Sequence, residues 1–385
     1  MSSFKILHVI PNLAKGGAQR LVISIAKAYL SIEDYQVKIL VFNSINDFAE
    51  DTKKLDITII PLNYLSKFPM RIKVYNVDKY TKFLSGYNPD VIHSHLKAGD
   101  LISRIKINKK IKYFAHLHAD NYLSKFNFQK VALKKSILKK NDHLLMMRLY
   151  RKTNTTFIAI SDEISRQYRE ILRFSRLKRN IRVLYNCTDF QKFTFPKRSI
   201  KIQNTKKINI INCARNIKIK NQVFLINVIE SFNKRDENFQ LKLTIIGDGV
   251  EHQNLTNLVH NLKLNQYVNF LGEVNDVEKF YKLSDIYVHS ALDGVFGIST
   301  IEALTTGLPI VGLKGPSYDK NIVNLRNALV VENNNVELFV DEIIKLVKNK
   351  EIYSTLVKNN LELGKFFSNH EYVKSLNNFY NSYEN

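Results

Sequence analysis

The stretch SALDGVFGISTIEALTTGLPIV, Ser290–Val311, has the pattern of a functional site more clearly than any other part of this chain. It follows an apolar, strand-like run over residues 286–288 and breaks at Asp293-Gly294. A short amphipathic run, Ser299–Thr306, then predicts a helix, which a Gly-Leu-Pro turn ends before a second apolar run. The succession of strand, loop, helix and strand is typical of an open α/β sheet.

The loop inside this stretch is a candidate anion-binding site. Ligands of open α/β sheets bind outside the carboxyl ends of the strands, where helix N-termini direct unpaired N–H groups at anions. Two carboxylates, Asp293 and Glu302, flank the loop. Spacing alone leaves an alternative open, in which Gly294 and Gly297 only make a turn and Glu302 is an exposed helix residue.

The same stretch resembles the C-terminal signature of glycosyltransferase family 4, the retaining, group 1 transferases with the GT-B fold. In that signature an acidic residue, a Gly-Phe-Gly turn and a second Glu precede a Gly-Leu-Pro strand start. The segment Glu302–Pro309 follows it closely. The first acid departs from it, because it is Asp293 and because Val295 is an extra residue that sets the acids nine apart, where the family has eight. We expect the loop to bulge around Val295.

The resemblance implies an α/β protein of GT-B type, with two Rossmann-like, doubly wound domains that face each other across a cleft. It places an acceptor-side domain at 1–199, a nucleotide-sugar-binding domain at 200–367 and a helix that crosses back to the first domain at 368–385. The polar stretch 190–205, which contains Pro196, is interpreted as the linker. Period-2 and period-3.6 patterns predict strands at 4–10, 37–42, 57–61, 91–95, 112–118, 157–160, 208–213, 241–246 and 267–271, and helices at 18–30, 72–84, 222–232 and 276–283.

The composition is that of a globular protein large enough for two cores. The 385 residues are 45% hydrophobic and 24% charged. Cys187 and Cys213 lie in apolar, strand-like contexts without metal-site spacing, so we expect reduced core residues and a cytoplasmic compartment. The sequence carries no pattern typical of a signal peptide or a membrane span.

Charge is distributed unequally along the chain. Residues 1–200 hold 37 Lys and Arg against 15 Asp and Glu, whereas residues 201–385 hold 21 against 20. An excess confined to one half indicates an anionic partner, such as a membrane leaflet, a phosphate-bearing acceptor or nucleic acid. Lys125–Lys152, with nine cations and one Asp among apolar residues, predicts a basic amphipathic helix. It favours peripheral attachment to the inner face of the cell membrane, and an ordinary solvated helix is the alternative.

The first domain offers two candidate groups. Gly16 and Gly17 precede a predicted helix, where a phosphate could approach the backbone closely. A plain tight turn is the alternative, but the segment Gly-Gly-Ala-Gln-Arg looks like the family's first glycine loop. His116 and His118 end a predicted strand, and they could equally be core or rim residues. By resemblance, His118 is the histidine that approaches the donor sugar.

The second domain offers a pair of cations. Arg215 and Lys220 follow the strand at 208–213 with the spacing of the family's two cations on the donor diphosphate. A guanidinium and an ammonium there stabilise the charge that develops on the leaving group, without proton transfer. By resemblance, Val274 lies near the nucleobase and Glu302 accepts hydrogen bonds from the ribose. Asp293 and the backbone N–H groups around Phe296, Gly297, Ile298 and Ser299 hold sugar hydroxyls and phosphate.

The function implied is a retaining glycosyltransferase, a hexosyltransferase of bacterial surface polysaccharide assembly. The donor is a nucleoside-diphosphate hexose or N-acetylhexosamine, with UDP favoured over GDP, and the acceptor is a saccharide or is linked to polyprenyl diphosphate. Because the sequence has no Asp-x-Asp, we expect no metal requirement. The alternative is a non-catalytic basic protein that binds anionic membrane or nucleic acid. Nucleic acid is not expected, because the chain lacks the aromatic-basic signatures of common nucleic-acid modules.

Overall fold

The structure, a computed structural model, describes residues 3–67, 71–118, 144–173, 175–195, 206–235, 238–291, 297–315 and 326–382. The chain divides into two compact units, Met1–Cys187 with Asn369–Asn385, and Thr188–Ser368. The division therefore comes earlier in the chain than the predicted boundary at 199/200. Helix α7 (Phe190–Phe193) packs on α11 (Ile298–Thr305), so the segment expected to be a linker begins as part of the second unit.

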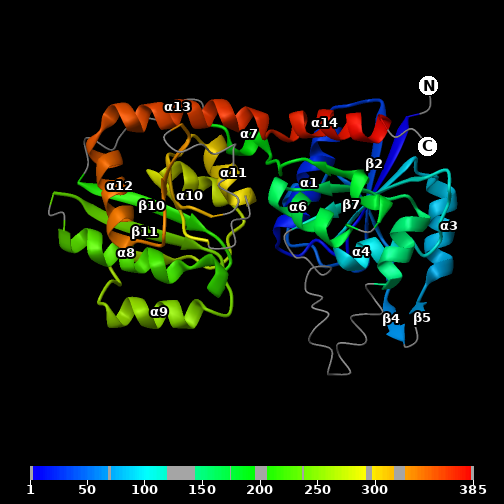
Figure 1. The fold of residues 1–385 in the computed structure, drawn as a ribbon, viewed down its shortest axis with the longest axis horizontal. Helices are drawn as coiled ribbons and strands as arrows, with labels where there is room; N and C mark the ends of the chain where they lie inside the picture. The colour runs from blue at the N-terminus through cyan, green and yellow to red at the C-terminus, as the bar shows by residue number, and fades with distance from the viewer. Residues whose placement is uncertain are drawn as a thin grey trace. The chain divides into compact units, whose positions relative to one another are not determined.

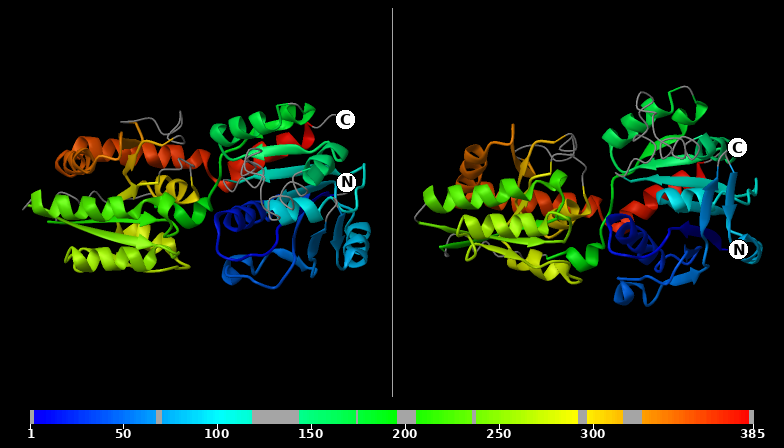
Figure 2. Two further views of the ribbon diagram at one scale, coloured as in Figure 1. Left: turned by 60° about the horizontal axis from the view of Figure 1, so that its bottom comes forward. Right: turned by 90° about the horizontal axis from the view of Figure 1, so that it is seen from below.

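The described residues of the first unit form a seven-stranded sheet in the order β3-β2-β1-β6-β7-β8-β9. All neighbouring strands in it are parallel. Chain order reverses direction between β1 and β6, which is the switch point of a doubly wound sheet. Helices lie on both faces of the sheet (Figure 1, Figure 2). The strands are β1 (Phe4–Val9), β2 (Tyr35–Val41), β3 (Asp56–Ile59), β6 (Val91–His95), β7 (Lys112–Leu117), β8 (Thr156–Ala159) and β9 (Ile181–Val183).

The C-terminal helix belongs to the first unit. Helix α14 (Asn369–Asn381) packs on α1 (Gly17–Tyr29), and the Tyr29 hydroxyl donates to the side-chain oxygen of Asn377 over 2.5 Å. The other helical segments of this unit are α2 (Ala49–Thr52), α3 (Val77–Tyr87), α4 (Leu96–Ile102), residues 144–152, α6 (Asp162–Ile171) and the 3-10 turn η1 (Arg176–Asn180).

A hairpin replaces the beginning of the helix predicted at 72–84. Strand β5 (Arg71–Val74) pairs antiparallel with β4 (Tyr64–Lys67), and the helix starts only at Val77. The prediction was wrong because the alternation in Arg-Ile-Lys-Val has the period of a strand. Asn76 then adopts a left-handed φ of 60°, which separates the hairpin from the helix.

The described residues of the second unit form a six-stranded, parallel sheet in the order β12-β11-β10-β13-β14-β15. Its switch point lies between β10 and β13, and its main core joins the sheet to the helices α8 (Gln222–Arg235) and α12 (Val336–Lys348). The strands are β10 (Lys207–Cys213), β11 (Gln240–Ile246), β12 (Val268–Phe270), β13 (Ile286–His289), β14 (Ile310–Leu313) and β15 (Ala328–Val331). The remaining helical segments described in this unit are η3 (Lys218–Lys220), α9 (His252–Asn261), α10 (Val277–Leu283) and α13 (Lys350–Phe366).

Over the described ranges, no helix has the length and apolar character that crossing a membrane requires.

Candidate active site

Arg215 and Lys220 lie in the loop after β10, beside the switch point of the second sheet. Arg215 is exposed, and Lys220 ends the turn η3 with its side chain half-buried. On the other side of the switch point, Ser290 follows β13 and is fully buried. Its hydroxyl donates to the backbone carbonyl of Lys220 over 2.8 Å. This hydrogen bond joins the loop that carries Arg215 and Lys220 to the end of β13.

Asn216 anchors the cation loop to the turn after β11. Its backbone N–H donates to the carbonyl of Asp248 over 2.9 Å, and its side-chain amide donates to the carbonyl of Gly247 over 3.1 Å. Gly247 has a φ of +125°, and a Cβ there would lie 2.2 Å from the carbonyl oxygen of Ala214. Only glycine permits this approach, so the Gly-Asp-Gly turn sets how closely the loop that bears Arg215 packs against it.

Gly297, Ile298 and Ser299 form the start of α11, where the sequence predicted a helix. Gly297 is the N-cap and has an extended backbone. The first N–H groups of a helix have no intrahelical acceptors, so this end can bind an anion. Asp293 and Phe296 lie outside the described residues, and their roles stay predictions.

Glu302, on the same helix, is only 2% exposed and is not the exposed residue of the alternative interpretation. Its Oε2 lies 3.2 Å from the hydroxyl of Tyr281 on α10, and this hydroxyl also lies 3.1 Å from the carbonyl oxygen of Ser299. Burial, with Cys213 and Glu302 nearby, raises the pKa of Tyr281 well above its usual value. Tyr281 therefore remains protonated and can donate a hydrogen bond to Glu302, a contact that sequence reasoning missed.

Val274 lies half-buried in the turn after β12. That turn is tied to the one after β11, because the N–H of Gly247 donates to the carbonyl of Gly272 over 2.7 Å. The turns after three neighbouring strands, β12, β11 and β10, are thus linked by backbone hydrogen bonds at the carboxyl edge of the sheet.

In the first unit, Gly16 and Gly17 lie at the carboxyl end of β1, beside that sheet's switch point. Both are exposed, and Gly16 is the N-cap of α1 with no side-chain cap. Across the switch point, Leu96 follows β6 with a φ of 64°, a backbone conformation that non-glycine residues rarely adopt. Strain of this kind is concentrated at functional sites.

His118 and His116 belong to a larger group that sequence reasoning did not assemble. His8 on β1, His93 and His95 on β6, and these two at the end of β7 lie on one face of the sheet, with ring centroids 4.6 to 5.6 Å apart between neighbours. We call these five residues the histidine column. All are buried except His118, which is half-buried.

Burial keeps the column uncharged. It lowers the pKa of His8 to about 3 and that of His118 to about 4. It also lowers the pKa values of His93, His95 and His116 well below the usual value, and the neighbouring rings lower them further.

Neutral imidazoles could also bind a metal ion. His8, His93 and His95 offer ligand nitrogens that all lie within 4.8 Å of one another. In the structure these rings contact one another directly, with His8 Nδ1 3.0 Å from His95 Nε2.

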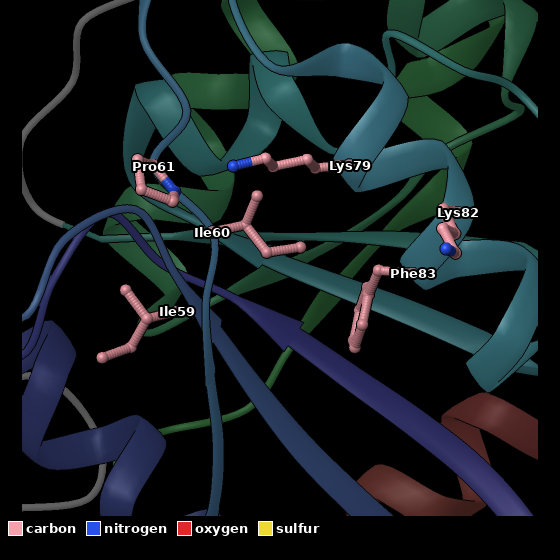
Figure 3. Close-up of a pocket in the computed structure, with 6 residues that line it drawn as sticks. All are labelled: Ile59, Ile60, Pro61, Lys79, Lys82 and Phe83. Carbon is pink, nitrogen blue, oxygen red and sulfur yellow. The ribbon is translucent and has the colours of Figure 1, made fainter.

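A shallow pocket of about 380 Å³ opens in the first unit between the end of β3 and α3. Figure 3 shows Lys79, Lys82 and Phe83 from α3 lining it together with the segment 59–61. Its lining contains none of the predicted site residues and combines apolar side chains with two ammonium groups.

Only the end of the basic segment Lys125–Lys152 is described, because 119–143 lie outside the described residues. Residues 144–152 are helical and bury Met146 and Tyr150 in the core. Their other side lines an open pocket of about 360 Å³ formed by Leu144, Met147, Arg148, Arg151, Lys152, Ile171 and Ser175.

Comparison with known families gives two adjoining matches. The family model described as Glycosyltransferase Family 4 matches residues 15–192, and the one described as Glycosyl transferases group 1 matches residues 194–362. Between them they cover nearly all of both units.

Curated relatives match over part of the chain. An uncharacterized glycosyltransferase of Haemophilus influenzae is 30% identical over 154 residues, 40% of this chain and 43% of that protein. The alpha-monoglucosyldiacylglycerol synthase of Acholeplasma laidlawii is 28% identical over 186 residues, 48% of this chain and 46% of that one. The chain thus spans about half the length of the curated relatives it matches.

A solved structure matches over the whole fold. Anabaena Alr3699/HepE in complex with UDP and glucose superposes with a TM-score of 0.74 at 15% identity, over 99% of this chain and 100% of that one. The predicted GT-B fold class, with two doubly wound parallel sheets, is confirmed.

Proposed function

Because this chain belongs to glycosyltransferase family 4, we propose that it moves a hexose or N-acetylhexosamine from a nucleoside-diphosphate sugar to a saccharide or lipid-linked acceptor, with retention of configuration. The observation that carries the proposal is the hydrogen bond from Ser290 to the Lys220 carbonyl. It holds the loop with two cations against the end of β13, at a switch point where α/β sheets bind ligands. The next described element, α11, has no side-chain cap at its N-terminus.

Arg215 and Lys220 are proposed to bind the diphosphate of the donor. As the bond between the anomeric carbon and the diphosphate oxygen breaks, the electron pair passes to that oxygen. A preorganised cation there is worth roughly 3 to 4 kcal/mol in the transition state. The N–H groups of Ile298 and Ser299 at the α11 N-terminus would add to the same stabilisation.

Glu302 is proposed to accept a hydrogen bond from the ribose, and Tyr281 to hold its carboxylate in place. Val274 would lie beside the base. Gly16 and Gly17 would offer backbone N–H groups to a donor phosphate, and His118 would contact the donor sugar. Asp293 would hold sugar hydroxyls.

Retention is proposed to follow from attack by the acceptor hydroxyl on the face that the diphosphate leaves. The acceptor oxygen bonds to the anomeric carbon, and its proton passes to a leaving phosphate oxygen. Trapping of a sugar covalently attached to the enzyme would contradict this course.

We propose UDP as the preferred nucleotide and no metal requirement. The similarity to a protein that was solved with UDP and glucose supports the first, and the absence of Asp-x-Asp from the sequence supports the second.

We propose an acceptor of bacterial surface polysaccharide assembly, used by a cytoplasmic enzyme held on the inner face of the membrane. The basic first half and the cationic lining of the pocket at Arg148, Arg151 and Lys152 support this. Flotation with vesicles should recruit the protein when they contain anionic lipid. Equal recruitment to neutral vesicles would remove the argument.

Calorimetric titration of the full chain with UDP, GDP, ADP and CMP tests the donor site. We expect one nucleotide to bind best, and Arg215→Ala and Lys220→Ala each to weaken it by at least tenfold. Lys218→Ala is the matched control, because Lys218 is an exposed cation of the same turn outside the family spacing. Binding weakened equally by Lys218→Ala, or no binding of any nucleotide, would contradict the assignment.

A further inference from the structure

The histidine column contains two strings of ring nitrogens. In one, His93 Nδ1 lies 2.7 Å from the hydroxyl of Tyr380, and His93 Nε2 lies 3.2 Å from His116 Nδ1. These groups are all buried. In the other, His8 Nδ1 lies 3.0 Å from His95 Nε2, and His95 Nδ1 lies 3.3 Å from Nε2 of the half-buried His118. Of the two strings, only the second ends at a residue that is partly exposed.

Each neutral imidazole has one N–H and one lone pair, so the protons of the second string are coupled. If His8 donates from Nδ1, His95 accepts at Nε2 and donates from Nδ1, and His118 accepts at Nε2 and carries its own proton on Nδ1. If the string runs the other way, His118 has a bare Nδ1, and His8 carries its proton on Nε2.

The buried end of the string decides between the two directions. His8 is fully buried, and its Nε2 has no hydrogen-bond partner within the described part of the chain. A buried N–H without an acceptor is rarer and more costly than a buried acceptor without a donor. The first direction, which leaves only a lone pair at His8 Nε2, is therefore favoured.

We propose that His8 and His95 are positioning residues that hold His118 as the neutral Nδ1–H tautomer, so that it presents a hydrogen-bond donor to an oxygen of the donor sugar. The proposal rests on the proposed function, in which His118 contacts that sugar. It adds that the partner of His118 accepts a hydrogen bond, as a hydroxyl or an acetamido carbonyl oxygen does.

Nitrogen-15 NMR of the full chain, labelled in its histidine rings, tests the proposal, because the protonated and bare ring nitrogens have distinct shifts. The ring signals that are lost in His118→Gln are assigned to His118. In the wild type we expect the proton on Nδ1. In His95→Phe, which removes the donor to Nε2, we expect His118 to lose this preference and populate the Nε2–H form.

Matched variants separate positioning from packing. His93→Phe removes an equally buried ring two residues away on the same strand, but in the other string, so it should leave the His118 tautomer unchanged. His95→Asn retains an amide N–H near the position of Nδ1, so His118 should keep its proton on Nδ1 in this variant. His95→Asn also serves as the variant to study if His95→Phe does not fold.

A proton on Nε2 in the wild type would overturn the proposal. The proposal would also be overturned if His95→Phe left the His118 tautomer unchanged. A change in the ring shifts of His8 and His95 when EDTA removes a bound metal ion would overturn it as well. None of these readouts needs a nucleotide or turnover. Their failure is therefore distinguishable from failure of the transferase assignment, which would show as absent nucleotide binding.

Discussion

Mild acid should destabilise the first unit strongly, through the four fully buried histidines of the column, His8, His93, His95 and His116. Their folded-state pKa values are lowered, that of His8 to about 3 and the others well below the usual value. Between pH 7.5 and 5.5 they stay neutral in the folded chain. In the unfolded chain, with pKa values near 6.5, they take up protons over the same interval.

The sign and size of the effect follow from linkage. The unfolded state binds more protons as the pH falls, so the free energy of unfolding falls with it. Each buried histidine contributes a loss of about 1.4 kcal/mol between pH 7.5 and 5.5, or about 5 kcal/mol for the four. This is a large part of the roughly 5 to 15 kcal/mol that stabilises a typical domain.

Urea unfolding followed by circular dichroism measures this, since the chain has no tryptophan to report by fluorescence. We expect the midpoint of the first unit's transition to fall by roughly 2 M urea between pH 7.5 and 5.5. His93→Phe should remove about a quarter of the pH dependence, whatever its effect at pH 7.5. A midpoint that hardly moves with pH would refute the reasoning, because it would mean that the rings are charged or solvated in the folded chain.

Three further predictions concern the second unit and the chemistry. Tyr281→Phe removes the hydroxyl 3.2 Å from Glu302 Oε2 and should cost about 1 to 3 kcal/mol of stability while raising KM for the donor, as measured by unfolding and by initial rates. Gly247→Ala should displace the cation loop by its clash with the Ala214 carbonyl and weaken nucleotide binding at least tenfold. Gly86→Ala, whose new Cβ would have nothing within 4 Å, should bind normally and be slightly more stable. Turnover should persist in EDTA, and activity lost there but restored by manganese would show that a metal takes part.

Much of the architecture could be predicted from the sequence, because it rests on local patterns. Runs of β-branched residues alternating with amphipathic helices identify parallel α/β units, and β6 and the start of α8 fall where they were expected. Where patterns compete, the prediction failed. The sequence predicted a helix through the Arg-Ile-Lys-Val run because the apolar residues that follow it have helical spacing. In the structure this run forms β5.

The candidate site divides in the same way. Arg215 and Lys220 could be proposed as a pair because both stand in one loop at the spacing of the family's two cations. Tyr281 could not, since an aromatic residue in an amphipathic helix usually belongs to the core. The histidine column also could not be predicted from the sequence, because it depends on the register in which neighbouring strands pair. His8 pairs with His93, and His95 pairs with His116, only in the alignment that β1, β6 and β7 adopt in the folded sheet.

A crystal structure of the full chain with UDP bound would show directly where the donor lies. We expect the diphosphate within hydrogen-bond distance of Arg215, of Lys220 and of the first N–H groups of α11, at the switch point between β10 and β13. A nucleotide bound elsewhere, with these groups left in solvent, would contradict this expectation.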